Sequence, residues 1–438
     1  MTVEARNRRI STRVRRDKIG SAQRLVDRRF AKRLARARLH SAERAAFMRQ
    51  SGAIQQTLSR NACTLPKPKR NDDTTPKIAV ENFSFIDNPD QTLQSLSDIV
   101  HACNRNSVFQ IDFNDDVCLD IGPYMVFGLL FNQLPNNRCT GGKMSAQVRK
   151  AVDIVGLRKF AGIKLMPYGP AADIWPFQLD TYKSPFRLRH GFEQHESSKE
   201  KVTRRFAESV DTWLKQVGFS LNEDGGGWLR TLLGETLDNA RHAADDVIDG
   251  RWSIAGFMTK RTRQDGSDRF VCHIGIVTVG KTFAQTLQGS DDKAMLDVLR
   301  NYATRHTANH RSHDTLMTVS ALSDGVSCEG TRQKGTRGGC GMSSLVDMMG
   351  KLGGSDRADE QAELVLISGS SCLRLAHPYN VMPIDPDTGG AVQVFNSSQN
   401  VELPPDASYV FDLSGTFPGS VISIRFTLDP AHLERRVV

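Results

Sequence analysis

The chain has 438 residues, of which 39% are hydrophobic, and carries a formal net charge of +9 at pH 7. A chain of this length can hold two or three domains with ordinary hydrophobic cores. It has no run of about 18 apolar residues, which argues against a membrane span, and no apolar segment near its start that would indicate a secretory signal. Its eight cysteines are scattered without a Cys-x-x-Cys pair, so we expect reduced thiols in the cytoplasm rather than disulfides or a zinc site.

The positive charge is concentrated at the N-terminus. Residues 1–70 contain 20 Lys and Arg against 4 Asp and Glu, a net of +16, whereas the remaining residues contain 38 against 45, a net of −7. Residues 1–63 are therefore interpreted as a basic arm. Its segment 21–58 is expected to be helical, because apolar residues recur at a spacing of four (Val26, Phe30 and Leu34).

The basic arm has several interpretations. It could bind nucleic acid or another polyanion by releasing counterions, or it could be a solvated or partner-bound helix. A mitochondrial presequence is also rich in Arg and poor in acidic residues, but this arm is not notably rich in Ser. Residues 64–77 contain three prolines and are expected to form a linker.

A small α/β domain and a connector are expected over residues 78–196. A strand is predicted at 108–113 and helices at 124–134 and 145–155, after which the chain returns towards a strand at 156–165. The residues from there to Glu196 are poorly patterned.

A second α/β domain is expected over residues 199–428, followed by a tail at 429–438. A helix is predicted at 199–217, a break at Gly225 to Gly227, and a second helix at 228–244. Further strands and helices follow in this part of the chain: strands at 252–257, 270–279, 363–368 and 421–426, and helices at 291–306, 315–322 and 342–352. The strand at 270–279 is almost continuously apolar, which is typical of a central strand.

The helix predicted at 228–244 carries polar residues on one face. Glu235, Asn239 and His242 are spaced i, i+4 and i+7, which places them on the same side of a helix. A carboxylate there could accept a proton from a water molecule that attacks a phosphate, and an Asn oxygen could complete the coordination shell of Mg²⁺. The alternative is a solvated helix face, because Glu and Asn are common on protein surfaces.

A segment dense in glycine precedes the helix predicted at 342–352. It reads Gly335-Thr336-Arg337-Gly338-Gly339-Cys340-Gly341. Glycine lets the backbone approach an anion closely, and the following helix directs its N-terminal N–H groups towards that anion. The segment is not a Walker A loop, since no Gly-Lys-Ser/Thr follows. A flexible hinge is the alternative.

Together and in this order, the two motifs resemble the N box and the G2 box of the GHKL ATPase superfamily, which includes gyrase, the ninety-kilodalton heat-shock chaperone, histidine kinases and anti-sigma-factor kinases. The resemblance covers about residues 200–428. It implies a two-layer α/β sandwich of the GHKL (Bergerat) type that binds ATP with Mg²⁺.

The resemblance also implies roles for individual residues. Glu235 would be the general base, Asn239 the magnesium ligand, and His242 would lie near the metal-bound waters. The segment from Gly335 to Gly341, with Arg337, Gly338 and Gly339, would close a lid over the phosphates. The late strands and Gly415-Thr416 resemble the last strands of the family's sheet, with Thr416 at the nucleotide.

The chain departs from the family at the G1 box. In the family a strand ends in Asp-x-Gly-x-Gly, and the Asp binds the adenine amino group. Here Thr278 stands at the Asp position, Gly280 keeps the first glycine, and Thr282 replaces the second. A neutral Thr can accept one hydrogen bond, directly or through water, so we expect it to discriminate less well in favour of adenine.

Three histidines form a less specific pattern. His306, His310 and His313 are spaced i, i+4 and i+7, which could bind a metal. No Cys or carboxylate completes the set, so a polar helix or loop is the alternative.

The first domain weakly resembles STAS-type domains. The residues that carry this resemblance are Phe109 to Phe113, then Leu119-Asp120-Ile121-Gly122 and the helix that follows. Ile121 stands where STAS switches have a phosphorylatable Ser, which implies a packing or sensing module. An unrelated small α/β domain is the alternative.

The sequence thus predicts a cytoplasmic, regulatory ATP-binding protein of the GHKL class. Slow Mg²⁺-dependent hydrolysis or phosphotransfer would be coupled to a conformational change. The alternative is a nucleotide-sensing regulator or adaptor that does not hydrolyse nucleotide and that binds nucleic acid or another polyanion, or a protein partner, through residues 1–63. No membrane association is expected.

Overall fold

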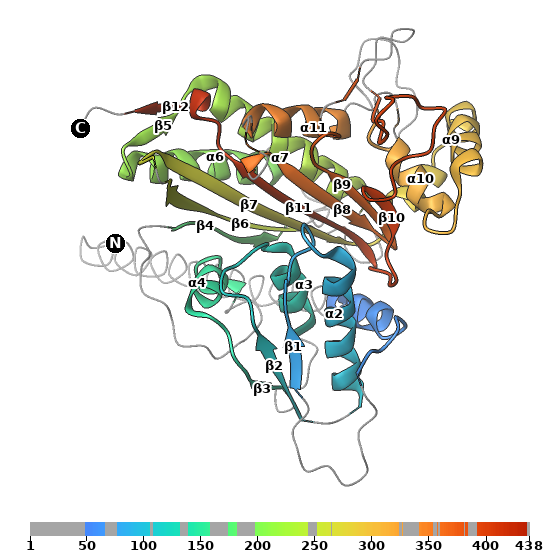
Figure 1. Ribbon diagram of the computed structural model, residues 1–438, viewed down its shortest axis with the longest axis horizontal. Helices are drawn as coiled ribbons and strands as arrows, with labels where there is room; N and C mark the ends of the chain where they lie inside the picture. The colour runs from blue at the N-terminus through green and yellow to red at the C-terminus, as the bar shows by residue number, and fades with distance from the viewer. Residues whose placement is uncertain are drawn as a thin grey trace, which may run out of the picture. The chain divides into compact units, whose positions relative to one another are not determined.

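The computed structural model describes residues 49–65, 77–105, 108–131, 139–157, 174–181, 198–243, 252–263, 265–323, 326, 341–353, 357, 360–380, 382–383 and 392–435. The chain divides into two compact units, Met1–Arg49 and Gln50–Val438. The described part of the second unit is a mixed α/β structure (Figure 1) with a three-stranded sheet, a seven-stranded sheet and a two-stranded sheet.

The three-stranded sheet belongs to a small lobe, residues 77–157. Its strands are parallel and ordered β1-β2-β3. They alternate along the chain with helices: β1 (Lys77–Val80), α2 (Pro89–Asn104), β2 (Phe109–Phe113), α3 (Gly122–Phe131), β3 (Cys139–Gly141) and α4 (Ala146–Ile154). Parallel strands need such helical crossovers, because each connection must return to the same end of the sheet. On β2 the alternate residues Phe109, Ile111 and Phe113 are buried in the core of the lobe.

The seven-stranded sheet is antiparallel throughout and forms the centre of a large lobe. Its order is β10-β9-β8-β11-β7-β6-β4. The strands are β4 (Ile174–Thr181), β6 (Trp252–Thr262), β7 (Asp268–Val279), β8 (Glu363–Ser368), β9 (Ser371–Leu375), β10 (Val410–Asp412) and β11 (Gly419–Thr427). β7 and β11 lie in the middle, and their apolar runs are buried on both faces.

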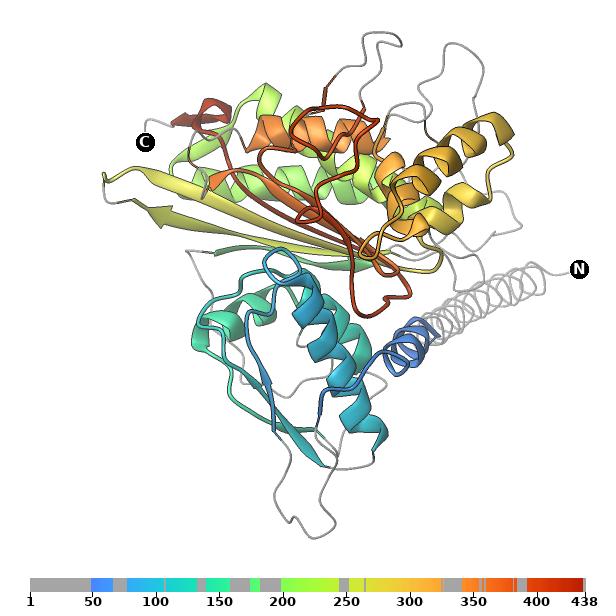
Figure 2. The same ribbon diagram turned by 45° about the vertical axis from the view of Figure 1, so that its right-hand side comes forward.

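Both faces of this sheet are covered. Helices α6 (Ser198–Gln216), α7 (Glu223–Ala243) and α11 (Gly341–Leu352) lie on one face, whereas α3 and α4 of the small lobe lie against the other (Figure 1, Figure 2). The large lobe also contains α8 (Phe283–Gln288), α9 (Lys293–His306), α10 (His313–Ser320) and the short helix η3 (Pro430–His432). A separate pair of strands, β5 (Phe219–Leu221) and β12 (Leu433–Arg435), joins the end of the described chain to the start of α7.

Some elements differ from the sequence predictions for identifiable reasons. The predicted break at Gly225 to Gly227 is wrong: these glycines lie in the first turns of α7. The side chain of Asn222 accepts a hydrogen bond from the N–H of Gly225 at 2.8 Å, which lets the helix begin before them. β4 falls within residues 78–196, yet it pairs with β6 and so belongs to the large sheet. Of the strand predicted at 156–165, residues 158–165 lie outside the described part.

The segment that follows the first unit packs into the second. Residues 49–58 are helical, and Ile54 and Leu58 are fully buried. Asn61 forms two hydrogen bonds with the backbone of Thr416, at 2.9 and 3.2 Å. The N–H of Thr64 donates to Asp98 of α2 at 2.9 Å. Residues 50–65 are therefore part of the folded unit, although the sequence pattern assigns residues up to 63 to the arm; residues 1–48 lie outside the described part.

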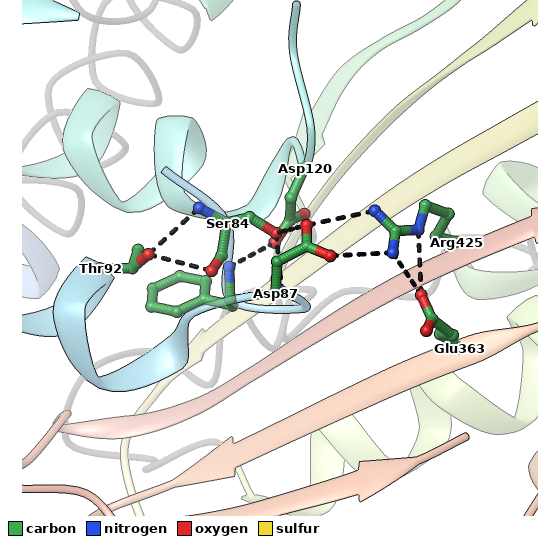
Figure 3. A network of polar contacts seen from close by, with 7 residues as sticks. Ser84, Asp87, Thr92, Asp120, Glu363 and Arg425 are labelled. Carbon is green, nitrogen blue, oxygen red and sulfur yellow. Dashed lines mark hydrogen bonds and ion pairs between the residues drawn. The ribbon is translucent and has the colours of Figure 1, made fainter. Parts of the chain in front are cut away.

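An arginine of the large sheet connects the two lobes. Arg425 lies on β11 and donates hydrogen bonds to both carboxylate oxygens of Asp87, at 3.0 and 3.2 Å (Figure 3). It also donates to Glu363 of the neighbouring strand β8 at 3.1 Å. The hydroxyl of Ser84 donates to Asp87 at 2.7 Å. Because a guanidinium binds a carboxylate through two parallel bonds, this contact fixes the orientation of the Asp87 loop on the sheet.

Two glycines allow α3 to approach the sheet closely. A Cβ atom at Gly275 of β7 would lie 2.9 Å from side-chain atoms of Ile121 and Met125, and 3.1 Å from the Cα of Gly122. A Cβ at Gly122 would lie 2.3 Å from the hydroxyl of Ser423. Any larger residue at either position would push the two lobes apart.

We therefore expect Gly275→Leu to lower the free energy of unfolding by about 3 kcal/mol, because it overpacks the interface between the lobes. Urea unfolding monitored by tryptophan fluorescence measures this change. Gly227→Ala in α7 is the matched control, since a Cβ there meets no atom within 4 Å and alanine favours a helix by roughly 0.5–1 kcal/mol over glycine. Equal stabilities of Gly275→Leu and the wild type would contradict the close packing.

Candidate functional site

Helix α7 carries the first predicted motif in its second half. Leu229, Leu232, Leu233 and Leu237 are fully buried against the sheet. Glu235 is half-buried, and Asn239 and His242 lie in the last two turns of the helix. The three positions share a helix face, as their spacing predicts.

α7 and α11 pack side by side and antiparallel (Figure 1). The ammonium of Lys351, at the end of α11, lies 4.4 Å from the ring centroid of Trp228, near the start of α7. With a rise of about 1.5 Å per residue, Asn239 lies roughly 16 Å along α7 from Trp228, and Gly341 lies roughly 15 Å along α11 from Lys351. The end of α7 and the start of α11 are therefore level with each other.

The end of β7 lies at this same end of the large lobe. Phe219, which comes just before α7, packs against Phe270 near the start of β7, with ring centroids 5.1 Å apart. α7 is about 30 Å long and lies over β7, and it contacts α8, which follows β7. Thr278 and Gly280, at the end of β7, thus lie towards the C-terminal end of α7 and the start of α11.

A row of five polar residues, four of them buried and one half-buried, crosses the sheet at the same level. The register pairs Thr278 of β7 with Ser420 of β11, Ser420 with Ser368 of β8, Ser368 with Ser371 of β9, and Ser371 with Asp412 of β10. We call these five residues the polar row. They face the helices, because the residues two positions away belong to the helix-side core: Ile276, Ile422, Leu366, Leu373 and Val410.

The middle of the polar row is held by hydrogen bonds within the fold. The hydroxyl of Ser420 donates to that of Ser368 at 3.2 Å, and Ser368 accepts the N–H of Phe283, the first residue of α8, at 2.8 Å. The side chain of Thr278 makes no hydrogen bond among the described residues. It is nevertheless only 2% exposed.

The far end of the polar row is anchored to α10. The hydroxyl of Thr315 donates to the carboxylate of Asp412 and is also hydrogen-bonded to the hydroxyl of Ser371 at 2.9 Å. Asp412 accepts the N–H and the hydroxyl of Ser312 at 2.8 and 2.9 Å. Ser312 caps α10, and the carboxylate of Asp412 holds this capping residue on the sheet.

The start of β11 can lie close to the backbone of Thr278 only because it carries a glycine. Gly419 has a φ of +126°, and a Cβ there would lie 2.2 Å from the carbonyl oxygen of Thr278. The N–H of Gly280 donates to the carbonyl of Pro418 at 3.2 Å. The turn that leaves β7 is thus tied to the start of β11.

The remaining predicted nucleotide contacts are only partly described. Thr416 lies in the turn between β10 and β11, where it is exposed and its backbone is paired with Asn61. Gly341 is the first residue of α11. Gly335, Arg337, Gly338 and Gly339 lie outside the described residues, as do the side chains of Asn239 and His242.

The three histidines do not share a helix. His306 ends α9, where it is buried against Tyr302 with ring centroids 4.8 Å apart. His310 lies in the turn that follows, and His313 begins α10. No group of three or more His, Cys, Asp or Glu residues suited to a metal is found in the described part of the chain. The i, i+4, i+7 spacing fails here because the helix ends between His306 and His310.

In the small lobe, the residues of the weaker resemblance lie at the contact with the large sheet. Asp120 is buried and accepts the N–H groups of Phe85 and Gly122, both at 2.9 Å. Burial raises the pKa of Asp120 to about 6. Ile121 is fully buried and lies against Gly275 of β7.

A scan against models of protein families finds no match to this chain, and searches of curated proteins and of solved structures find none either. Within the described ranges, no helix combines the length and the apolar character needed to span a membrane.

Proposed function

We propose that this chain is an ATP-binding protein of the GHKL class, and that its Mg²⁺·nucleotide binds where the ends of α7 and β7 meet the start of α11. One observation carries the proposal. Three segments that are far apart in the sequence, at 235–242, 278–280 and 341, lie at the same end of the large lobe. The apolar core alone would not require these three segments to lie together.

Each segment supplies a different part of the chemistry. Glu235 would accept a proton from the attacking water, and the N–H groups at the start of α11 would face the phosphates. Asn239 would hold Mg²⁺, which, when bound, neutralises phosphate charge. Slow hydrolysis or phosphotransfer at this site would be coupled to a conformational change.

The metal role of Asn239 gives a direct test. Asn239→Ala should weaken ATP binding in the presence of Mg²⁺ at least tenfold, because the metal loses an oxygen ligand, and should change affinity by less than threefold in EDTA. Isothermal titration calorimetry measures both affinities. Thr231→Ala, at an exposed position of the same helix, is the control. Equal losses with and without Mg²⁺ would contradict a metal role.

A second function, a nucleotide-sensing regulator that binds a polyanion, is favoured by the charge of the first unit. Residues 1–49 contain 16 Lys and Arg against 4 Asp and Glu, a net of +12. Deletion of residues 1–49 removes this charge and leaves Ile54 and Leu58 in the core of the second unit.

We expect the truncated chain to elute from heparin at much lower salt than the full chain, because fewer counterions are exchanged. Its affinity for ATP should change by less than twofold, since the deleted residues belong to the other compact unit. Heparin chromatography and calorimetry measure the two properties. If both chains elute at the same salt concentration, the arm does not bind polyanions.

A further inference from the structure

The turn between β10 and β11, residues 413–418, touches the end of β7 on one side. We call it the β10–β11 turn. The carbonyl of Pro418 accepts the N–H of Gly280, the residue that follows β7, at 3.2 Å. The N–H of Phe417 donates to the carbonyl of Gly369, between β8 and β9, at 2.9 Å. A shift of this turn would therefore move the chain that leaves β7.

The other side of the β10–β11 turn is held by two side chains from outside the large sheet. The side chain of Asn61 accepts the N–H of Thr416 at 2.9 Å and donates to the carbonyl of Thr416 at 3.2 Å. Its amide nitrogen also donates to the hydroxyl of Ser97 in α2 at 3.0 Å. Asp90, in the first turn of α2, accepts the N–H and the hydroxyl of Ser414 through one oxygen, at 2.6 and 2.8 Å. The turn is thus attached at two neighbouring points.

A glycine in the turn makes this attachment possible. A Cβ atom at Gly415 would lie 2.7 Å from the amide nitrogen of Asn61 and 3.3 Å from the side chain of Leu93 in α2. The φ of Gly415 lies outside the left-handed region. The close contact with Asn61, rather than an unusual backbone conformation, therefore accounts for the glycine.

We infer that residues 50–65 and α2 regulate the nucleotide site proposed above by holding the β10–β11 turn in the position that binding requires. This inference rests on the proposed function. A turn that is already fixed does not have to be ordered when the nucleotide binds, so the affinity is higher. Coupling between two sites is reciprocal, so bound nucleotide strengthens the contacts of the turn with Asn61 and Asp90. A partner that pulls residues 50–65 away from the turn lowers the affinity for nucleotide.

Calorimetric titration of four variants with ATP and Mg²⁺ tests the inference. Asn61→Ala and Asp90→Ala should each weaken ATP binding at least about fivefold, the lower end of typical coupling between sites. Asp90→Asn should bind ATP within twofold of the wild type, because one carbonyl oxygen can still accept both hydrogen bonds from the turn.

Gln94→Ala is the control for a purely structural effect. The amide of Gln94 donates to the carbonyl of Ala62 at 2.9 Å and to Asp98 at 3.1 Å, so its hydrogen bonds hold the same segment on α2 but do not go to the turn. Gln94→Ala should lower the free energy of unfolding, measured with urea, and leave the affinity for ATP within twofold of the wild type.

The outcomes separate this inference from the proposed function. A wild-type chain that does not bind ATP at millimolar concentration would overturn both. If the wild type binds ATP but either Asn61→Ala or Asp90→Ala binds it within twofold of Gln94→Ala, the inference fails and the proposed function stands. An Asp90→Asn variant as weak as Asp90→Ala would also contradict the inference.

The wild type offers a measurement that does not depend on how the variants fold. Binding of a non-hydrolysable ATP analogue with Mg²⁺ should slow hydrogen exchange at the amides of Ser414 and Thr416, which donate to Asp90 and Asn61. Unchanged exchange at both amides, in a chain that binds the analogue, would overturn the inference.

Discussion

Glu235→Gln should reduce Mg²⁺-dependent phosphate release from ATP at least 100-fold while leaving ATP bound with an affinity within threefold of the wild type. Gln has nearly the shape of Glu but cannot accept a proton from the attacking water, and a general base contributes roughly 10²–10⁴-fold to such reactions. Single-turnover release of phosphate measures the rate, and calorimetry measures the affinity.

The control for this prediction is the same substitution elsewhere on the helix. Glu223→Gln changes an exposed carboxylate in the first turn of α7 and should leave the rate within twofold of the wild type. A Glu235→Gln variant that hydrolyses ATP at the wild-type rate would exclude Glu235 as the base. A wild-type chain that binds ATP without any turnover would instead support the nucleotide-sensing regulator.

The second large predicted effect is on the pH dependence of the unfolding free energy. It concerns two buried groups on either side of the contact between the lobes. Asp120 of the small lobe is buried, which raises its pKa from 3.8 to about 6. His273 lies on β7, stacked on Phe257 with ring centroids 4.5 Å apart. Burial, and then the charge of Arg425, lowers the pKa of His273 from 6.5 to about 3.

These two groups act on stability in opposite directions. The folded state holds the proton of Asp120 more tightly than the unfolded state does. The contribution of Asp120 to the unfolding free energy is therefore lost as pH rises from about 4 through 6. The folded state holds His273 neutral, so its contribution is present above pH 6.5 and is lost as pH falls towards 3. Each slope is about 1.4 kcal/mol per pH unit, and between pH 4 and 6 they cancel.

Removing the ionisable group of either residue should therefore reveal the pH dependence that the other one causes. Relative to the wild type, Asp120→Asn should lose about 3 kcal/mol of unfolding free energy between pH 6 and pH 4, because His273 then acts alone. His273→Phe should gain a similar amount over the same range. Urea unfolding at pH 4, 5 and 6 gives both slopes, which do not depend on any constant offset caused by the substitutions.

The exposed carboxylate of Asp116 provides the control for this pair. Asp116→Asn changes a residue in the same loop that is exposed, and its unfolding free energy should run parallel to that of the wild type across the pH range. If all three variants run parallel to the wild type, neither buried group titrates as the structure indicates.

Helices and central strands could be predicted where one apolar pattern determines one face. The predicted helix at 199–217 corresponds to α6 because Val202, Phe206, Val210 and Leu214 recur every turn and are buried together. α2 is missing from the sequence predictions although it has a usable signal: Pro89 at its first turn, then Leu93, Leu96 and Val100 at helical spacing.

Other features depend on contacts between distant segments. β4 joins the large sheet through pairing with β6, and no local pattern of Trp175 and Phe177 specifies that partner. The polar row arises from the register of five strands, and a Ser such as Ser368 or Ser371 at the end of a strand is common in any sheet. The shared face of Glu235 and Asn239 follows from spacing alone, but their proximity to the start of α11 follows from how the two helices pack.

The most direct test of the account is amide hydrogen exchange of the full chain with and without Mg²⁺ and a non-hydrolysable ATP analogue at millimolar concentration. We predict slower exchange in the last turns of α7, from Thr278 to Phe283, and in the first turn of α11, with β1 to β3 of the small lobe unchanged. Exchange that is unaltered in all three segments, or slowed only in the small lobe, would contradict a nucleotide site at this end of the sheet.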